Sequence, residues 1–140
     1  MGTDILHFNR YKKDMKIVSD VPRRINKNSQ IELVPISENG VSWRELRKLA
    51  KNRGTNFGEK DAKFLFKNQQ LLPKRPGRAH HFIYVPFPGT VYRASDGSQY
   101  IPSFIYYGGR GWHGGWWELH FAWVDENSWH SNSRFVSFRK

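Results

Sequence analysis

The residues of this chain whose types and spacing best suit chemistry are Glu118 and His120, which lie two positions apart in the aromatic stretch 112–123. In a β-strand both side chains point to one face, roughly 7 Å apart at a rise of ~3.3 Å per residue. This spacing suits a general base and a general acid around a phosphate group, with Arg110 or Arg134 holding the negative charge. A metal-independent, ribonuclease-like enzyme is therefore one hypothesis, although most such pairs belong to the solvated face of a strand.

Aromatic residues around this pair suggest a second kind of site. Strand alternation places Trp116 on the face of Glu118 and His120, and Tyr106 and Trp112 could extend it into a platform that stacks bases or sugars. Because Trp112 lies in a glycine-rich connection, an exposed loop there could instead serve a protein–protein or inhibitor contact. Burial is the more common fate of a strand aromatic. The opposite face, which we expect to be core, carries Trp117, Leu119, Phe121 and Trp123.

Other chemistries find little support in the sequence. The chain has no cysteine, and its histidines show no HExxH spacing, so we expect no metal site. There is no P-loop, dinucleotide fingerprint or Gly-x-Ser-x-Gly turn, so we expect no cofactor. The absence of cysteine suits a reducing compartment and favours a cytoplasmic protein. No apolar run is long enough to cross a bilayer, so we expect no membrane partner.

Charge and aromatic residues divide the chain into unlike halves. The net charge is +11, with 23 Lys and Arg against 12 Asp and Glu. Residues 1–79 hold 18 of the basic and 8 of the acidic residues, whereas residues 80–140 hold 16 of the 22 aromatic residues. A basic excess of this size favours nucleic acid or an acidic protein as partner, and excludes mimicry of nucleic acid by an acidic surface.

Two helices are predicted in the basic half. Ser42 and Glu45 form a capping box that begins the first helix, and Gly54 supplies its left-handed C-terminal position. The second helix should run from about Glu59 to Leu72. A helix-turn-helix is possible, but its turn would be long, so two helices packed on a sheet are favoured. The predicted nucleic-acid-binding residues on these helices are Arg44, Arg47, Lys48, Lys51, Lys60, Lys63 and Lys67.

The second half has the alternation and turn signals of antiparallel strands. Strands are predicted over 81–86, 90–94, 99–107, 116–124 and 135–139, with a less certain edge strand over 31–36. Asp96-Gly97 predicts a two-residue type I′ hairpin that pairs Ala94 with Gln99 and Tyr92 with Ile101.

We therefore expect a single α+β domain over residues 1–140. A basic, flexible or surface-packed arm (1–30) precedes a helical pair (42–72) that covers one face of an antiparallel sheet of four or five strands (81–139). The favoured function is a non-enzymatic protein that binds nucleic acid, or an acidic partner, through its helical half. The ribonuclease-like enzyme and the protein-interaction or inhibitor module are the alternatives.

Overall fold

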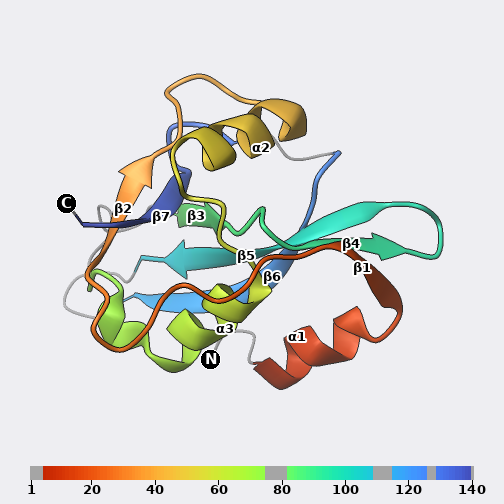
Figure 1. Ribbon diagram of the computed structural model, residues 1–140, viewed down its shortest axis with the longest axis horizontal. Coiled ribbons are helices and arrows are strands. Elements are labelled where there is room, and N and C mark those ends of the chain that lie inside the picture. The colour runs from red at the N-terminus through yellow and green to blue at the C-terminus, as the bar shows by residue number, and fades with distance from the viewer. Residues whose placement is uncertain (1–4, 75–81, 109–114, 126–128, 140) are drawn as a thin grey trace.

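Two antiparallel sheets and three α-helices make up the part of the chain that the computed structural model describes, residues 5–74, 82–108, 115–125 and 129–139 (Figure 1). The predicted α+β class and antiparallel pairing are confirmed. No helix within these ranges is long and apolar enough to span a bilayer. The helices are α1 (Ile5–Lys12), α2 (Trp43–Asn52) and α3 (Glu59–Lys67), with a 3-10 turn at Gln69–Leu71. The strands are β1 (Met15–Ser19), β2 (Ile31–Pro35), β3 (Phe82–Pro86), β4 (Val91–Ala94), β5 (Gln99–Tyr107), β6 (Trp116–Trp123) and β7 (Arg134–Phe138).

The long strand β5 organises the larger sheet. It pairs along its whole length with β6 on one edge, and on the other edge first with β4 and then with β3. β1 adds to β4 and forms the outer edge, while β2 and β7 form a separate two-stranded sheet. The predicted edge strand over 31–36 is thus confirmed as β2, and its Pro35 stands at the end of the pairing with β7.

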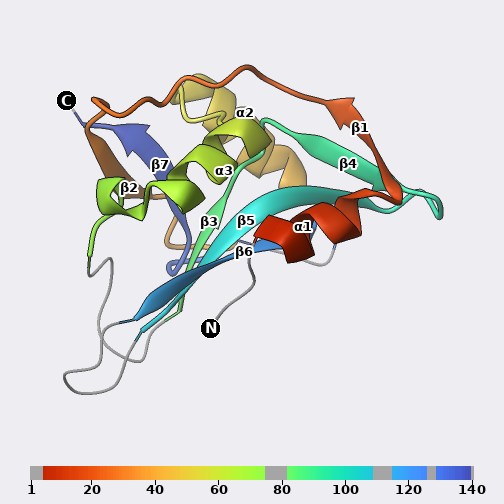
Figure 2. The ribbon, with the colours of Figure 1, turned by 90° about the horizontal axis from the view of Figure 1, so that it is seen from below.

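The first thirty residues are more regular than the predicted arm. Phe8 of α1 is buried and stacks on Phe121 of β6, with ring centroids 4.1 Å apart. After β1 the chain runs across the molecule toward β2 (Figure 2). Asp61 of α3 anchors this crossing, because its Oδ1 accepts the backbone N–H groups of Arg24 and Ile25 at 3.0 and 2.8 Å. The segment is therefore held to the surface by hydrogen bonds and apolar contacts.

Local signals place α2 as predicted, whereas α3 is shorter than predicted. The capping box between Ser42 and Glu45 is present, and Gly54 has a φ of +69° just beyond the helix end. α3 stops at Lys67 instead of continuing toward residue 72. The side-chain amides of Asn68 and Gln69 donate to the carbonyls of the last helical turn, and a 3-10 turn follows. These amides thus compete with continuation of the α-helical backbone pattern.

The hairpin between β4 and β5 differs from the predicted register by one residue. Tyr92 pairs with Tyr100 and Arg93 with Gln99, so the predicted pairs Ala94–Gln99 and Tyr92–Ile101 are wrong. The Gly97 N–H donates to the Ala94 carbonyl at 3.0 Å, and Gly97 has a φ of +90°. This is a three-residue loop with glycine at the left-handed position, the next most common solution after a two-residue turn.

The two predicted helices do not share a face of the larger sheet. α2 packs in a cluster with Ile101 and Ala122, whereas α3 belongs to a cluster with Phe104 and Leu119. Within β5 and β6 these pairs of residues have opposite parity, and side chains alternate between faces along a strand. In Figure 1, α2 and α3 accordingly lie on either side of β3 and β5. The expected packing of both helices on one face is not supported.

Candidate functional site

One face of β3, β5 and β6 carries most of the polar and aromatic residues that could do chemistry. The registers align side chains of the three strands into rows across this face. α2 covers the end of the face around Ile101 and Ala122, and the rows lie on the remainder. From the far end toward α2 the rows are Phe82–Tyr107–Trp116, then Tyr84–Ile105–Glu118, then Pro86–Ser103–His120.

Glu118 and His120 form a hydrogen-bonded pair on this face. His120 Nε2 lies 2.7 Å from Glu118 Oε1, and the Trp116 indole N–H donates to Glu118 Oε2 at 2.9 Å. Glu118 is only 15% exposed and His120 is 33% exposed. The carboxylate is therefore fixed from both sides by neighbours two residues away on its own strand. This arrangement can fix the orientation of an imidazole ring.

A pocket of about 430 Å³ opens beside His120. Tyr84, Ser103 and Ile105 form its floor with β6, and the segment 129–133 forms a wall. This wall is held to β3, since the Tyr84 N–H donates to the Asn132 carbonyl at 3.0 Å. The volume lies within the range of small-ligand sites. The pocket thus brings His120 together with His130, a second histidine from the wall.

Sequence reasoning did not select the residues that complete this pocket. His130, Asn132 and Tyr84 come from elements whose relation to β6 depends on the pairing of β3 with β5. Strand parity would have identified Tyr84 once that register was known, because Tyr84, Ile105 and Glu118 share a row. For His130 we find no signal in the sequence beyond its residue type.

The predicted aromatic platform is changed by the structure. Tyr106 is buried and packs against Trp117, because its register pairs it with that core residue. Tyr107, one position later, stacks on Trp116 with ring centroids 5.4 Å apart and meets Phe82 edge to face at 5.0 Å. Trp116 and Phe82 are nearly half exposed. Trp112, the remaining predicted member, lies outside the described residues, as does Arg110.

The pKa of Tyr107 is affected by burial and by the carboxylate of Glu118 in the next row. Burial, together with the negative charge of Glu118 and the neighbouring Tyr84, raises the pKa of the Tyr107 hydroxyl above its usual value. The phenol therefore stays neutral over the ordinary pH range and can act there as a hydrogen-bond donor.

Arg134, the second arginine considered as a phosphate ligand, has a different role. Its guanidinium donates to the carbonyls of Ser131 and Ser133 within the turn before β7. Because Asn132 and Ser133 line the pocket while Arg134 does not, the arginine holds the wall in place.

The basic residues of α2 form a row, and the ion pairs among the described residues include none of them. Arg44, Arg47, Lys48 and Lys51 follow the spacing of one helix face, and all but the half-buried Arg47 are exposed. None of the ion pairs found within the described ranges involves these four residues. Arg47 lies over the ring of Trp43, 5.2 Å from its centroid. We call these four residues the α2 row.

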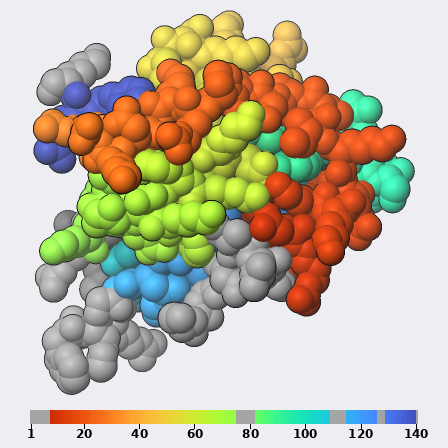
Figure 3. All heavy atoms as spheres, turned by 60° about the horizontal axis from the view of Figure 1, so that its bottom comes forward, coloured from red at the N-terminus to blue at the C-terminus, as the bar shows by residue number. Residues whose placement is uncertain are grey.

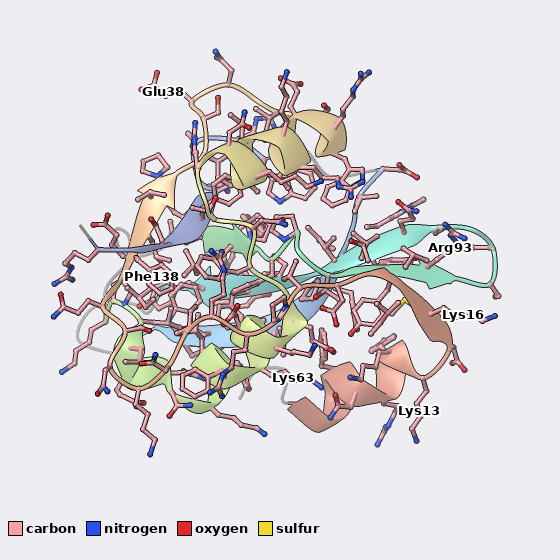
Figure 4. All side chains as sticks on the ribbon, in the orientation of Figure 1. Lys13, Lys16, Glu38, Lys63, Arg93 and Phe138 are labelled. Atoms are coloured by element: carbon pink, nitrogen blue, oxygen red, sulfur yellow. The ribbon has the colours of Figure 1, made fainter. Side chains whose placement is uncertain are left out.

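The lysines of α3, in contrast, belong largely to an internal charge network. Glu59, which is buried, accepts ion pairs from Lys12 at 3.0 Å and Lys63 at 3.5 Å. Lys60 lies 3.4 Å from Asp20. Burial and the neighbouring ammonium of Lys12 lower the pKa of Lys63. Figure 4 shows Lys63 between α3 and α1, away from α2.

The predicted basic residues are therefore divided into two places. The crossing segment 20–30, orange in Figure 3, lies between α2 (yellow) and α3 (green). Of the α3 lysines, Lys67 is exposed and outside the ion pairs described above. The α2 row is the part of the predicted surface whose charge is least compensated.

Within the described ranges, no group of three or more His, Asp or Glu side chains is placed to hold a metal ion. The chain matches none of the protein-family models, curated proteins or solved structures with which it was compared. The candidate sites therefore rest on the geometry of the chain itself.

Proposed function

We propose that this protein binds nucleic acid through the α2 row. The observation that carries the proposal is the contrast in charge compensation: Lys60 and Lys63 of α3 form ion pairs with Asp20 and Glu59, whereas none of the ion pairs among the described residues involves the α2 row. Like charges at positions i and i+4 of a helix, such as Arg44 and Lys48, destabilise it slightly. A bound polyanion would remove that cost.

The geometry of the row suits a phosphate backbone. From residue 44 to residue 51 an α-helix rises about 10 Å, at 1.5 Å per residue. Duplex DNA carries one charge for about 1.7 Å of its axis, so several phosphates lie within reach of such a row. Arginine also offers a planar fork that can donate two hydrogen bonds to one phosphate. An acidic protein surface is the alternative partner, and it can be separated by experiment.

The test is to replace the four residues of the α2 row with glutamine and to measure binding to a duplex and to a single strand over a range of salt concentrations. Each lost phosphate contact should lower the log–log salt slope by about 0.7–0.9, so the variant should lose about 3 units of slope. The matched control replaces Arg10, Lys13, Lys16 and Arg93 with glutamine. All four are exposed, and they come from α1, the α1–β1 turn, β1 and β4 in that order. Their replacement removes the same charge, and Figure 4 shows Lys13, Lys16 and Arg93 away from α2.

Each outcome of this comparison is informative. Loss of slope in the α2 variant with a smaller change in the control supports the proposal. Equal losses in both variants would show that net charge alone attracts the polyanion, and would overturn it. If poly-glutamate competes as well as nucleic acid at equal charge concentration, the partner is an acidic protein surface instead.

A further inference from the structure

We propose that the pocket beside β6 cleaves single-stranded RNA without a metal ion, with His120 as general base, His130 as general acid and Glu118 as the residue that positions His120. Both histidines line the same pocket of about 430 Å³. A single ligand seated in it would therefore lie beside both residues. This inference rests on the proposed function for how RNA is held, and on the pocket alone for the chemistry.

Glu118 gives His120 the properties of a base. With its Nε2–H donated to Glu118 Oε1, the ring carries its lone pair on Nδ1, which is then free to accept a proton. The carboxylate stabilises the imidazolium that forms, and the Trp116 indole N–H keeps the carboxylate in place. The same logic orients the histidine in hydrolases that use a carboxylate behind an imidazole.

His130 is held in position by the backbone of the loop before α2. A Cβ built on Gly40 would lie 2.7 Å from His130 Cε1 and 3.0 Å from Nδ1, so the ring packs directly against this glycine. The neighbouring Trp129 is buried and forms an antiparallel bridge with Val41 through two backbone hydrogen bonds. The second histidine thus follows a residue that is tied to the start of the α2 region.

The proposed step balances without any further reactant. His120 removes the proton from a ribose 2′-hydroxyl, and the 2′-oxygen attacks the adjacent phosphorus. The bond from phosphorus to the 5′-oxygen of the next nucleotide breaks, and that oxygen takes a proton from His130. The products are a 2′,3′-cyclic phosphate and a free 5′-hydroxyl. Neither oxidation nor reduction occurs, and the two histidines have exchanged protonation states.

Features around the pocket favour a single strand of RNA. The exposed aromatic row of Phe82, Tyr107 and Trp116 lies two residues along β6 from Glu118 and can stack an unpaired base. At the other end, Trp129 lines the pocket and packs against Trp43 of α2, with ring centroids 6.3 Å apart. Arg47 in turn lies over Trp43. Through these two contacts Arg47 of the α2 row is connected to the wall of the pocket, and the row could hold the continuing phosphate backbone.

Titratable groups from several elements lie near His120. Glu118 lies on its own strand, Tyr84 on β3, and His130 in the wall of the pocket. On the other side of β6, residue 120 also borders a second pocket of about 590 Å³, lined by Tyr11, Asp14 and Tyr100 among others. Glu118 holds the His120 ring through the 2.7 Å hydrogen bond, so its loss should misplace the base, which lowers kcat and leaves KM nearly unchanged.

The experiment measures cleavage of a single-stranded RNA oligomer and of the DNA strand of the same sequence, with EDTA present and at low salt. We expect RNA cleavage to a 2′,3′-cyclic phosphate and no DNA cleavage. His120→Gln and His130→Gln should each lower the rate by roughly 10²–10⁴-fold. Glu118→Gln should lower kcat less and leave KM nearly unchanged, while the control Glu38→Gln, in the loop before α2, should match the wild type.

Thermal midpoints close to the wild-type value exclude misfolding, and Gly40→Ala provides a second probe that displaces His130 without removing it. Absent RNA cleavage, equal cleavage of DNA, or activity that survives both histidine substitutions would overturn the inference. If RNA still binds through the α2 row but stays intact, this inference is wrong and the proposed function stands. If cleavage persists while the α2 variant binds as well as the wild type, the proposed function is wrong and this inference stands.

Discussion

α2 and α3 carry similar rows of basic residues, yet the fold uses them in opposite ways. On α3, Lys63 is a quarter exposed and paired with Glu59. On α2, Lys48 is exposed and takes part in none of the ion pairs among the described residues. The difference arises because α3 contacts α1 and the segment after β1, which bring Lys12 and Asp20 to it from far along the chain.

This comparison teaches that a count of charges does not measure a charged surface. Lysines that pair inside the fold contribute to stability, whereas lysines left unpaired cost a little stability and remain available to a partner. This difference between the two helices can be tested by substitutions that change the charges of one helix and leave the other helix unchanged.

The largest effect is expected from Glu59→Gln. This substitution removes the charge that Lys12 and Lys63 share and leaves two partly buried ammonium groups without a counter-charge, which should lower the free energy of unfolding by about 3 kcal/mol. The matched change on α2 is Glu45→Gln, where glutamine can still complete the capping box. Urea denaturation of both variants checks the prediction. Similar losses of unfolding free energy in the two variants would mean that the ion pairs of Glu59 contribute no more to stability than the capping box of α2 does.

A smaller effect is expected from Tyr92→Phe at high pH. Burial, together with the carboxylates of Glu59 and Asp20, raises the pKa of the Tyr92 hydroxyl far above its usual value. For an acid whose pKa is raised in the folded state, stability is present below the unfolded pKa and is lost as pH rises above it. Above pH about 10 the wild type should therefore lose about 1.4 kcal/mol per pH unit relative to the variant.

The measurement is the free energy of unfolding of both proteins between pH 7 and pH 11. The difference between them should be constant up to about pH 9 and then change in favour of phenylalanine. A difference that stays constant up to pH 11 would contradict the environment assigned to Tyr92.

The smallest effect is expected from Arg44→Glu on α2. The new carboxylate, in the first turn of the helix, would face Arg47 and Lys48, replacing like-charge repulsion with attraction, and should raise the free energy of unfolding by about 0.3–0.5 kcal/mol. The same change should weaken nucleic-acid binding. A stability gain joined to a binding loss would sharpen the contrast with α3, whereas a clear loss of stability would show that the α2 row has partners within the fold. Thermal unfolding and a binding titration check both signs.

The parts of the fold that were predictable depend on signals close together in the sequence. Ser42 and Glu45 specify the start of α2 through their own hydrogen bonds, and Gly54 marks its end by its backbone conformation. The long strands β5 and β6 follow from alternation. The common face of Glu118 and His120 was predictable for the same reason, whereas their direct hydrogen bond at 2.7 Å was not, since we expected the two side chains about 7 Å apart.

The remaining parts depend on contacts between distant segments. β1 is short and largely exposed, and it is a strand because it pairs with β4. The role of Tyr106 was mistaken because the pairing parity of β5, which turns it toward Trp117, is not visible in its residue type. The pocket wall that bears His130 was missed because its position depends on β3, β7 and Gly40 together.

The hydrogen bonds of Glu118 have a consequence for how this face can evolve. Two partners of the carboxylate, Trp116 and His120, are neighbours on its own strand, so these two hydrogen bonds are encoded by five consecutive residues. Their geometry depends on one strand and not on the length of a connecting loop. A single-residue insertion within β6, however, would turn part of the constellation toward the core. The arrangement of Trp116, Glu118 and His120 is thus sensitive above all to insertions and deletions within β6.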